Sequence, residues 1–422
     1  MRAKLIAVAI AAGLGVTSFT VAAAAAAPAQ DRTLPTTSNA EVELLKAQLA
    51  TLQAKVEELE QRTDAQSDIN VSTGQAVAQA TKVTVASDKK FAALEKLVNN
   101  TQLSGRMYFD FTSIDDKNSD MGKTDKSGIG LDVKRFYLGV DHKFDDIWSA
   151  NLTTDFNYSS SDGQTSLFVK KAYVEGKFDQ AAVLRVGSSD MPWVPFAEKY
   201  YGFRYVENTL TDRLKYGNSA DWGLHLGGDI GAGKSLNYAV SVVNGRGYKN
   251  PGRSKGVDVE GRVGFVPFDN MVVAVGGYSG HRGQETENIN APNTARRGDF
   301  MVAYASDAFR LGAEYFTARN WNNVLTMATD KADGYSLWGS VAVADGVNLF
   351  ARYDNAKLSR TLDRASKDVY YNAGVEFQVT KGFRLAGVWK HGKVDKSVDA
   401  PAPLHVQNVK TNEIGVFGEV RF

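Results

Sequence analysis

The chain has 422 residues, of which 49 are basic and 48 acidic, with a formal net charge of +1 and no cysteine. This balance leaves no basic surplus for a nucleic-acid partner, and the lack of cysteine excludes disulfides, a thiol nucleophile and a zinc–thiolate site. Beyond the N-terminus there is no run of ~18 apolar residues, so no internal transmembrane helix is predicted.

The N-terminus has the pattern of a secretory signal peptide. Arg2 and Lys4 precede an apolar run over residues 5–16, and Ala-Pro-Ala at 27–29 offers a small-x-small cleavage site. We expect residues 1–29 to be removed on export. The alternative, a permanent anchor, calls for a longer apolar run.

Residues 30–101 form a separate segment with a predicted coiled-coil helix. Apolar residues alternate three and four apart at the a and d positions of three heptads: Val42, Leu45, Leu49, Leu52, Val56 and Leu59. A shorter apolar pattern follows over 91–98. The narrow stripe and its charged flanks favour self-association, and the alternative is an amphipathic helix lying on a neighbouring element.

From residue 102 onward the apolar period changes to two. Leu224 and Leu226, for example, oppose His225, as in a strand with one face in lipid and the other in water. Sixteen strands are predicted, at 102–112, 130–144, 147–159, 165–178, 181–188, 222–230, 234–244, 257–267, 271–282, 297–307, 309–320, 333–344, 347–357, 368–380, 383–394 and 409–422.

The connections alternate in length. Links after even-numbered strands are short, such as Asp145-Asp146, whereas those after odd-numbered strands are mostly long. This alternation is typical of an outer-membrane barrel with tight periplasmic turns and large outer loops. The final strand ends at Phe422 with its apolar residues on one face, as expected where a barrel closes. The predicted fold is therefore a 16-stranded antiparallel transmembrane β-barrel over 102–422, preceded by a periplasmic helix.

The third outer loop, Ser189–Asp221, is the longest connection. Structureless loops above ~15 residues are usually functional. Folded inward, this loop would narrow a wide aqueous lumen and set its selectivity. The alternative is a loop that covers the mouth or packs on a neighbouring subunit.

Three segments resemble a known family: residues 134–140 (KRFYLGV), 184–192 (LRVGSSDMP) and 221–224 (DWGL). They make residues 102–422 similar to the Gram-negative outer-membrane porins, most of all to the phosphate-selective porin O and P family. The resemblance implies a homotrimer in which each subunit has its own pore.

Strand parity and the third loop give the candidate pore-lining residues. A charge on the lipid face would cost ~2–4 kcal/mol at mid-membrane, so charged strand residues belong inside. The pore-lining and constriction candidates are Arg106, Arg135, Lys171, Arg185, Asp190, Glu198, Lys199, Arg204, Glu207, Asp212, Arg213 and Lys215. On the strands alone, nine basic and nine acidic residues are assigned to the lumen, and this balance predicts weak ion selectivity. The basic ones are Arg106, Arg135, Lys171, Arg185, Arg262, Arg310, Arg352, Arg384 and Lys390, and the acidic ones are Asp110, Asp141, Glu175, Asp258, Glu260, Asp299, Glu314, Asp354 and Glu376. The alternative role for these charges is wall-to-wall ion pairing that stiffens the barrel.

One motif is misleading. Residues 228–235 (GDIGAGKS) match the phosphate-binding P-loop pattern, but a predicted strand follows where the chemistry needs a helix. The five histidines form no metal-spaced cluster, and there is no nucleophile elbow. We expect no catalytic, cofactor or metal site.

The sequence therefore predicts a passive porin for small hydrophilic solutes in the lipid of a Gram-negative outer membrane. The alternatives are an anion- or phosphate-selective channel of the same fold, a structural tether whose coiled coil contacts peptidoglycan, and a barrel enzyme built on His281 or His391.

Overall fold

The computed structural model describes residues 39–119, 122–159, 164–396 and 408–422. The predicted signal peptide, residues 1–29, lies outside the described residues. The chain divides into two compact units between Lys89 and Lys90, close to the boundary predicted at residue 101.

The first described element is one long helix, α1 (Asn39–Asn100), of 62 residues. The sequence predicted two separate apolar patterns in this stretch, and the structure joins them without a break. No helix among the described residues combines the length and apolar character needed to cross a membrane.

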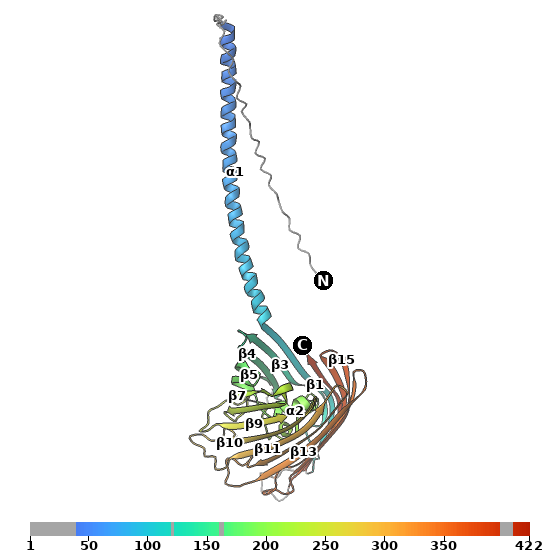
Figure 1. Ribbon diagram of the computed structural model, residues 1–422. Coiled ribbons are helices and arrows are strands. Elements are labelled where there is room, and N and C mark those ends of the chain that lie inside the picture. Colours follow the sequence, from blue (N-terminus) through green and yellow to red (C-terminus); the bar gives the residue numbers. More distant parts are fainter. Residues whose placement is uncertain (1–38, 120–121, 160–163, 397–407) are drawn as a thin grey trace. The chain divides into compact units, whose positions relative to one another are not determined.

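The second unit is a closed antiparallel barrel (Figure 1). Its sixteen wall strands are β1 (Thr101–Asn118), β3 (Gly128–Lys143), β4 (Trp148–Ser159), β5 (Gln164–Asp179), β6 (Ala182–Asp190), β7 (Ala220–Ile230), β8 (Leu236–Val243), β9 (Asp258–Phe265), β10 (Met271–Gly280), β11 (Ala295–Ala305), β12 (Phe309–Arg319), β13 (Lys331–Ala344), β14 (Val347–Lys357), β15 (Lys367–Thr380), β16 (Phe383–Asp395) and β17 (Val409–Arg421). A two-residue strand, β2 (Gly122–Lys123), pairs with the end of β1. The predicted 16-stranded fold is confirmed.

The barrel closes where β17 pairs with β1. The register runs from Arg106 opposite Arg421 to Asn118 opposite Val409. Gly105 and Phe422 extend this ladder, with backbone bonds of 2.9 and 3.0 Å. A Cβ on Gly105 would lie 2.0 Å from the Phe422 ring, so only glycine fits beside that ring.

The two faces of the wall differ in polarity. On β12, Leu311 and Tyr315 are 64% and 44% exposed on the outer face, whereas Glu314 and Phe316 are buried on the inner face. This alternation follows from the two-residue pleat of a strand and places apolar side chains toward lipid.

The P-loop-like segment forms a turn between two strands. Residues 232–234 make a single 3₁₀ turn, and β8 begins at Leu236. No helix N-terminus follows the glycines, so the geometry that cradles a phosphate is not formed here.

Candidate functional site

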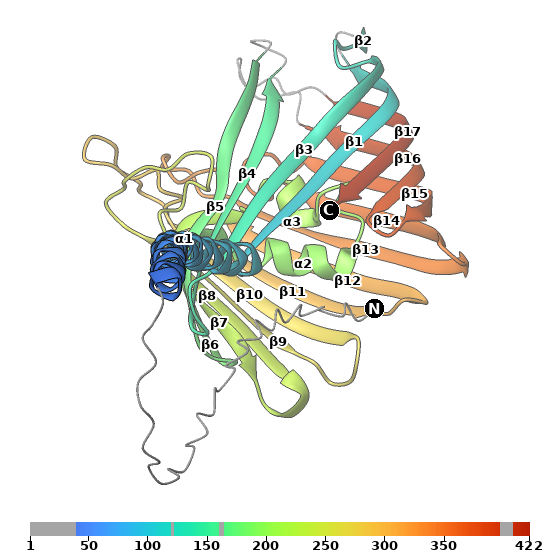
Figure 2. The same ribbon diagram turned by 90° about the horizontal axis from the view of Figure 1, so that it is seen from above.

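The segment between β6 and β7, residues 191–219, folds into two short helices, and we call it the inner segment. The first, α2 (Val194–Tyr201), has Pro195 in its first turn and ends at Gly202, where a left-handed φ of 83° lets the Gly202 N–H bond the Glu198 carbonyl. The second is α3 (Leu210–Arg213). Figure 2 shows both helices within the ring of strands.

Aromatic side chains fix the inner segment to the inner face of the wall. The Phe203 ring stacks on Phe350 of β14 with centroids 4.3 Å apart. Trp193 is fully buried, and its ring occupies the space beside Gly276 of β10, where a Cβ would approach it to 2.6 Å. The inner segment is therefore packed like a core, which fixes its path.

Five arginines of the wall donate hydrogen bonds to backbone carbonyls of the inner segment. The pairs are Arg262 with Pro192 at 3.0 Å, Arg310 with Lys199 and Tyr200 at 3.2 Å, Arg384 with Gly202 at 3.1 Å, Arg352 with Asn208 at 2.5 Å and Arg297 with Tyr216 at 2.5 Å. Each bond satisfies a carbonyl that has left water, and bonds from a charged donor are among the stronger ones.

The acidic side chains of the wall are also used by the inner segment. Glu260 accepts the backbone N–H of Trp193 at 2.9 Å, and Glu314 accepts its indole N–H at 2.8 Å. Arg213 donates to Asp354 at 2.9 Å. These three carboxylates are at most 2% exposed, so their charge is paired or hydrogen-bonded away from the open lumen.

A basic cavity of about 460 Å³ lies beside the inner segment. It is lined by Arg106, Tyr108, Lys170, Lys171, Asp190, Pro195, Glu198, Lys199, Gly202, Arg204, Arg310, Arg384 and Arg421. Eight of these residues are basic and two are acidic. Both acids are paired, Asp190 with Lys171 and Glu198 with Arg204, each at 2.5 Å.

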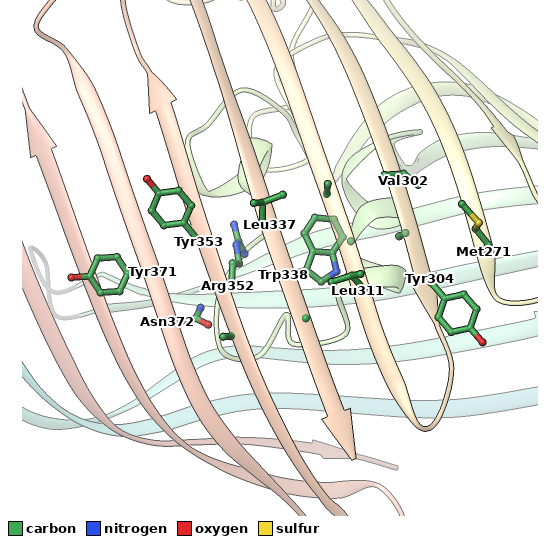
Figure 3. A pocket seen from close by; sticks show the side chains of 15 residues that line it. Met271, Val302, Tyr304, Leu311, Leu337, Trp338, Arg352, Tyr353, Tyr371 and Asn372 are labelled. Carbon is green, nitrogen blue, oxygen red and sulfur yellow. The ribbon is translucent and has the colours of Figure 1, made fainter. Parts of the chain in front are cut away.

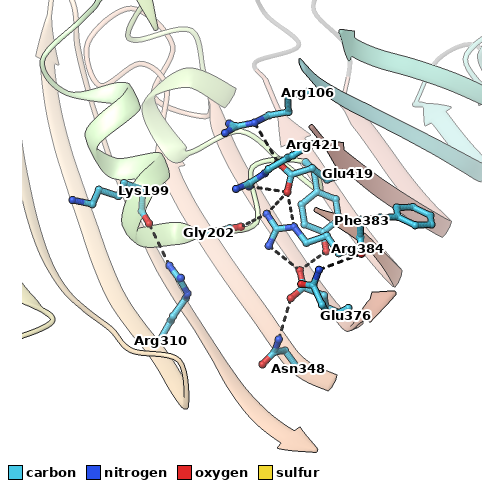
Figure 4. Close-up of polar contacts among 12 residues, drawn as sticks. Arg106, Lys199, Gly202, Arg310, Asn348, Glu376, Phe383, Arg384, Glu419 and Arg421 are labelled. Carbon is cyan, nitrogen blue, oxygen red and sulfur yellow. Dashed lines mark hydrogen bonds and ion pairs between the residues drawn. The ribbon is translucent and has the colours of Figure 1, made fainter. Parts of the chain in front are cut away.

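One buried carboxylate organises the arginines of the cavity (Figure 4). Glu419 of β17 pairs with Arg421 at 2.7 Å, with Arg384, and with Arg106 at 3.6 Å. Three guanidinium groups therefore surround Glu419, which is 1% exposed, and Arg384 also pairs with Glu376 at 3.0 Å. Three cations thus face two carboxylates. The cluster keeps a positive excess that faces the cavity.

Lys170 reaches the cavity because of a β-bulge. The register between β4 and β5 shifts at Thr153/Thr154, so that Thr153 faces Lys171 and Thr154 faces Val169. The extra residue, Lys170, turns its ammonium over the ring of Tyr137 at 4.4 Å. Strict alternation places only Lys171 in the lumen, so the sequence pattern does not predict Lys170. Arg421 is not among the predicted candidates either, although its parity with Glu419 indicates a lumen position.

Glu207, on another part of the inner segment, forms an ion pair with the barrel wall. Its carboxylate lies 3.5 Å from the Lys390 ammonium. Burial disfavours the charged carboxyl, but the cations of Lys390, Lys134 and nearby arginines outweigh burial and lower the pKa of Glu207 to about 2. Because the pKa is lowered on folding, this pair stabilises the fold above pH ~4.3 and loses that contribution as the pH falls toward the lowered pKa.

The structure separates the predicted site residues into two groups. Six of them line the basic cavity: Arg106, Lys171, Asp190, Glu198, Lys199 and Arg204. Arg135 instead pairs with the fully buried Asp155 at 2.7 Å, and Arg185 pairs with Glu175 at 2.7 Å.

The remaining loop candidates lie away from the cavity lining. Asp212 contacts Arg204 at 3.3 Å, and Arg213 bonds the wall carboxylates. Lys215 is exposed, with a φ of 65°. Among the described residues, no group of three or more His, Asp or Glu side chains is arranged to hold a metal ion.

Replacing Trp193 by alanine is expected to loosen the inner segment. The change removes a fully buried indole and leaves Glu314 without its 2.8 Å donor, and buried Trp-to-Ala changes cost about 3–5 kcal/mol. Limited proteolysis of the purified protein in detergent should cut the variant within 194–216 faster than the parent. Trp148→Ala, at the exposed start of β4, is the matched control. Equal cleavage of both variants would contradict this anchoring role.

The comparisons with known proteins agree with this geometry. Residues 101–197, from β1 into α2, match the family profile described as phosphate-selective porin O and P. This part of the chain is therefore similar to that family, and the whole barrel has the porin fold. No curated protein matches the chain significantly.

Two solved structures share the porin fold at low sequence identity. The outer membrane channel DcaP of Acinetobacter baumannii is 14% identical, with a TM-score of 0.55 over 76% of this chain and 97% of that one. An anion-selective porin from Comamonas acidovorans is also 14% identical, with a TM-score of 0.52 over 76% of this chain and 99% of that one. These similarities show the fold of the barrel.

Proposed function

We propose that this porin is a passive channel across the Gram-negative outer membrane for small hydrophilic solutes. In this proposal the inner segment is the constriction and the basic cavity beside it is part of the solute path. Transport needs no cofactor, because diffusion down a gradient through a water-filled lumen needs no chemistry.

The observation that carries the proposal is the double attachment of the inner segment. Five arginines bond its carbonyls and buried aromatic rings pack it on the wall. A loop held in this way presents a fixed set of side chains to the lumen, as a size and charge filter must. A loop that merely covered the mouth would not need buried partners on so many strands.

Conductance in planar bilayers tests this function. Purified full-length protein should insert in discrete, ohmic current steps in symmetric KCl. A folded, inserted protein that gives no steps would refute the channel and favour the structural tether or the barrel enzyme.

A second candidate function, preference for anions, is favoured by the basic cavity. Its two acids are paired, and the acids bonded to the inner segment are buried, so the exposed charge next to the constriction is mostly positive. The comparison porin from Comamonas acidovorans is named as anion-selective. The reversal potential in asymmetric KCl, measured on the same bilayers, separates an anion channel from an unselective one.

Export and placement form part of the proposal. Residues 1–29 would be removed as the signal peptide, residues 30–101 would lie in the periplasm, and residues 102–422 would span the membrane. The even number of wall strands supports this placement, because it returns both barrel ends to the same side.

We also propose a homotrimer with a three-stranded periplasmic stalk. The predicted a and d residues, Val42 to Leu59, are 39–63% exposed in the single chain, as an unpaired coiled-coil seam would be. Phe91 and Val98 continue the a series and Leu94 the d series in unbroken phase along the one helix α1. The middle of the seam is polar, with Thr63, Gln66, Asn70 and Thr73 at its positions, which weakens the coil. Barrel-to-barrel contact would then set the number of subunits, and tethering would raise the local concentration of the helices.

Deleting residues 40–63 tests the stalk. Native mass measurement in detergent should give a trimer for the full chain and a trimer of lower stability for the deletion, because three apolar heptads are lost. A monomer or dimer of the full chain would refute the trimer. A trimer whose stability does not change on deletion would assign the helix to another task, such as contact with peptidoglycan.

A further inference from the structure

The outer face of the wall carries a repeated pattern on neighbouring strands. On six strands, β11 to β16, an aromatic residue on the outer face is followed by a basic residue four positions nearer the outer loops. The pairs are Phe300 and Arg296, Tyr315 and Arg319, Tyr335 and Lys331, Tyr353 and Lys357, Tyr371 and Lys367, and Trp389 and Lys393. On β17, Ile414 and Lys410 have the same spacing.

The register brings these basic residues side by side. Arg296 faces Arg319, which faces Lys331, and Lys357 faces Lys367. We call Arg296, Arg319, Lys331, Lys357, Lys367 and Lys410 the outer basic row. None of the six side chains makes an ion pair with any residue in the described part of the chain. Lys357 also faces Asp333, and Lys367 also faces Asp395, but these carboxylates pair with Arg360 and Lys393 instead. Like charges directly opposite on neighbouring strands destabilise a sheet, so the row favours an external negative charge.

The row lies at the height of the lipid headgroups. Aromatic residues on the outer face of a barrel mark the membrane–water interface. Four residues span ~13 Å of strand, or ~10 Å along the membrane normal at the usual tilt. Long basic side chains extend their charge into the polar layer while their stems stay on apolar surface.

Among the described residues, the pattern does not extend to β8 and β9. The outward residues at the corresponding ends of β8 and β9 are Val242 and Val259. A general requirement of the outer leaflet would place cations there too. The side from β11 to β17 is therefore distinct.

An apolar groove of about 670 Å³ lies on the same side, next to the row (Figure 3). Leu311, Leu337 and Tyr353 stand along it, and small residues such as Gly339 and Ala351 leave it open. Tyr353 and Tyr371, which line the groove, are also the aromatic partners of Lys357 and Lys367. The groove thus continues the surface of the row toward the middle of the membrane.

We propose that the outer face of β11–β17 binds a phosphate-bearing glycolipid of the outer leaflet. Its phosphates lie along the outer basic row, and an acyl chain fills the groove below. The cationic row and the apolar groove have the same order and spacing along the membrane normal as the phosphates and the acyl chains of such a lipid. The inference depends on membrane insertion of the barrel and not on its conductance.

Native mass spectrometry of the full chain in detergent, titrated with lipid A, tests the proposal. The row variant Arg319→Gln, Lys357→Gln, Lys367→Gln should bind roughly a hundredfold more weakly, given the usual attraction of each cation to an anionic lipid. The control variant Lys143→Gln, Lys234→Gln, Lys381→Gln removes three positive charges from turns at the opposite strand ends and should bind like the parent. Equal affinity of the row variant and the control would overturn the proposal.

Three further measurements keep the test decisive if the row variant folds poorly. The parent protein should bind dephosphorylated lipid A far more weakly than lipid A, and its lipid A binding should weaken as NaCl rises. Filling the groove with Gly339→Leu and Ala351→Leu should also reduce lipid A binding. Equal binding of phosphorylated and dephosphorylated lipid by the parent would refute the role of the row.

Discussion

Removing residues 195–215 is expected to raise single-channel conductance roughly two- to threefold. The deletion takes α2 and α3 out of the lumen and frees the arginines that now bond their carbonyls. Wall carboxylates such as Asp354 would gain water, so the loss of their partners should not unfold a barrel that is held by its closed strand ladder.

The matched control for this deletion is removal of residues 286–290, part of the outer loop between β10 and β11. These residues form a local turn with a bridge between Thr286 and Ile289, and Glu287 lies 3.9 Å from Lys255 of a neighbouring loop. Their loss should leave conductance close to that of the parent. If the deletion of 195–215 inserts as a folded barrel with unchanged conductance, the inner segment is not the constriction.

Reversing the charge of Lys199 is expected to move ion selectivity toward cations. Lys199 is exposed in the basic cavity and makes no ion pair with any described residue, so Lys199→Glu changes the field without breaking an ion pair, and loses only a contact of the ammonium with the Tyr200 ring at 5.7 Å. In a tenfold KCl gradient the reversal potential should shift by roughly 10–20 mV, and less at high salt, because the Debye length is ~10 Å at 0.1 M.

Lys215→Glu makes the same charge change in the same segment, outside the cavity lining. Its effect on the reversal potential should be much smaller. Equal shifts for Lys199→Glu and Lys215→Glu would mean that the basic cavity has no special place on the ion path.

Arg135 and Arg185 lie on the lumen face by strand parity and within the segments that carry the family resemblance, which predicts that a change to Glu at either one moves the reversal potential toward cations. The contacts of Arg135 predict a different result. Arg135→Glu would set a carboxylate beside Asp155, which is 0% exposed. Two carboxylates in such a place repel and lose solvation, so reduced folding yield is the expected outcome rather than a clean change in selectivity.

The sequence by itself determined the barrel. Alternation of apolar and polar residues is a local property of the pleat, so strands such as 347–357 could be assigned residue by residue. The prediction for β1 stopped at residue 112 because Asp115 and Lys117 are polar. The structure extends β1 to Asn118, where those residues pair across the closing seam with Asn412 and Lys410 of β17. Pairing between strands so far apart in the sequence cannot be predicted from a local pattern of apolar and polar residues.

The charge of the lumen surface was decided only by the tertiary structure. A count of acids and bases along the strands gave near balance, but the inner segment covers Glu314 and Asp354, while Lys199 and Arg421 stay open to the cavity. The β-bulge that turns Lys170 inward is likewise a matter of register between strands. Contacts such as Arg352 with the carbonyl of Asn208 join residues 144 positions apart. Sequence periodicity fixes which face a side chain takes, but the packing of distant segments fixes whether its charge reaches water.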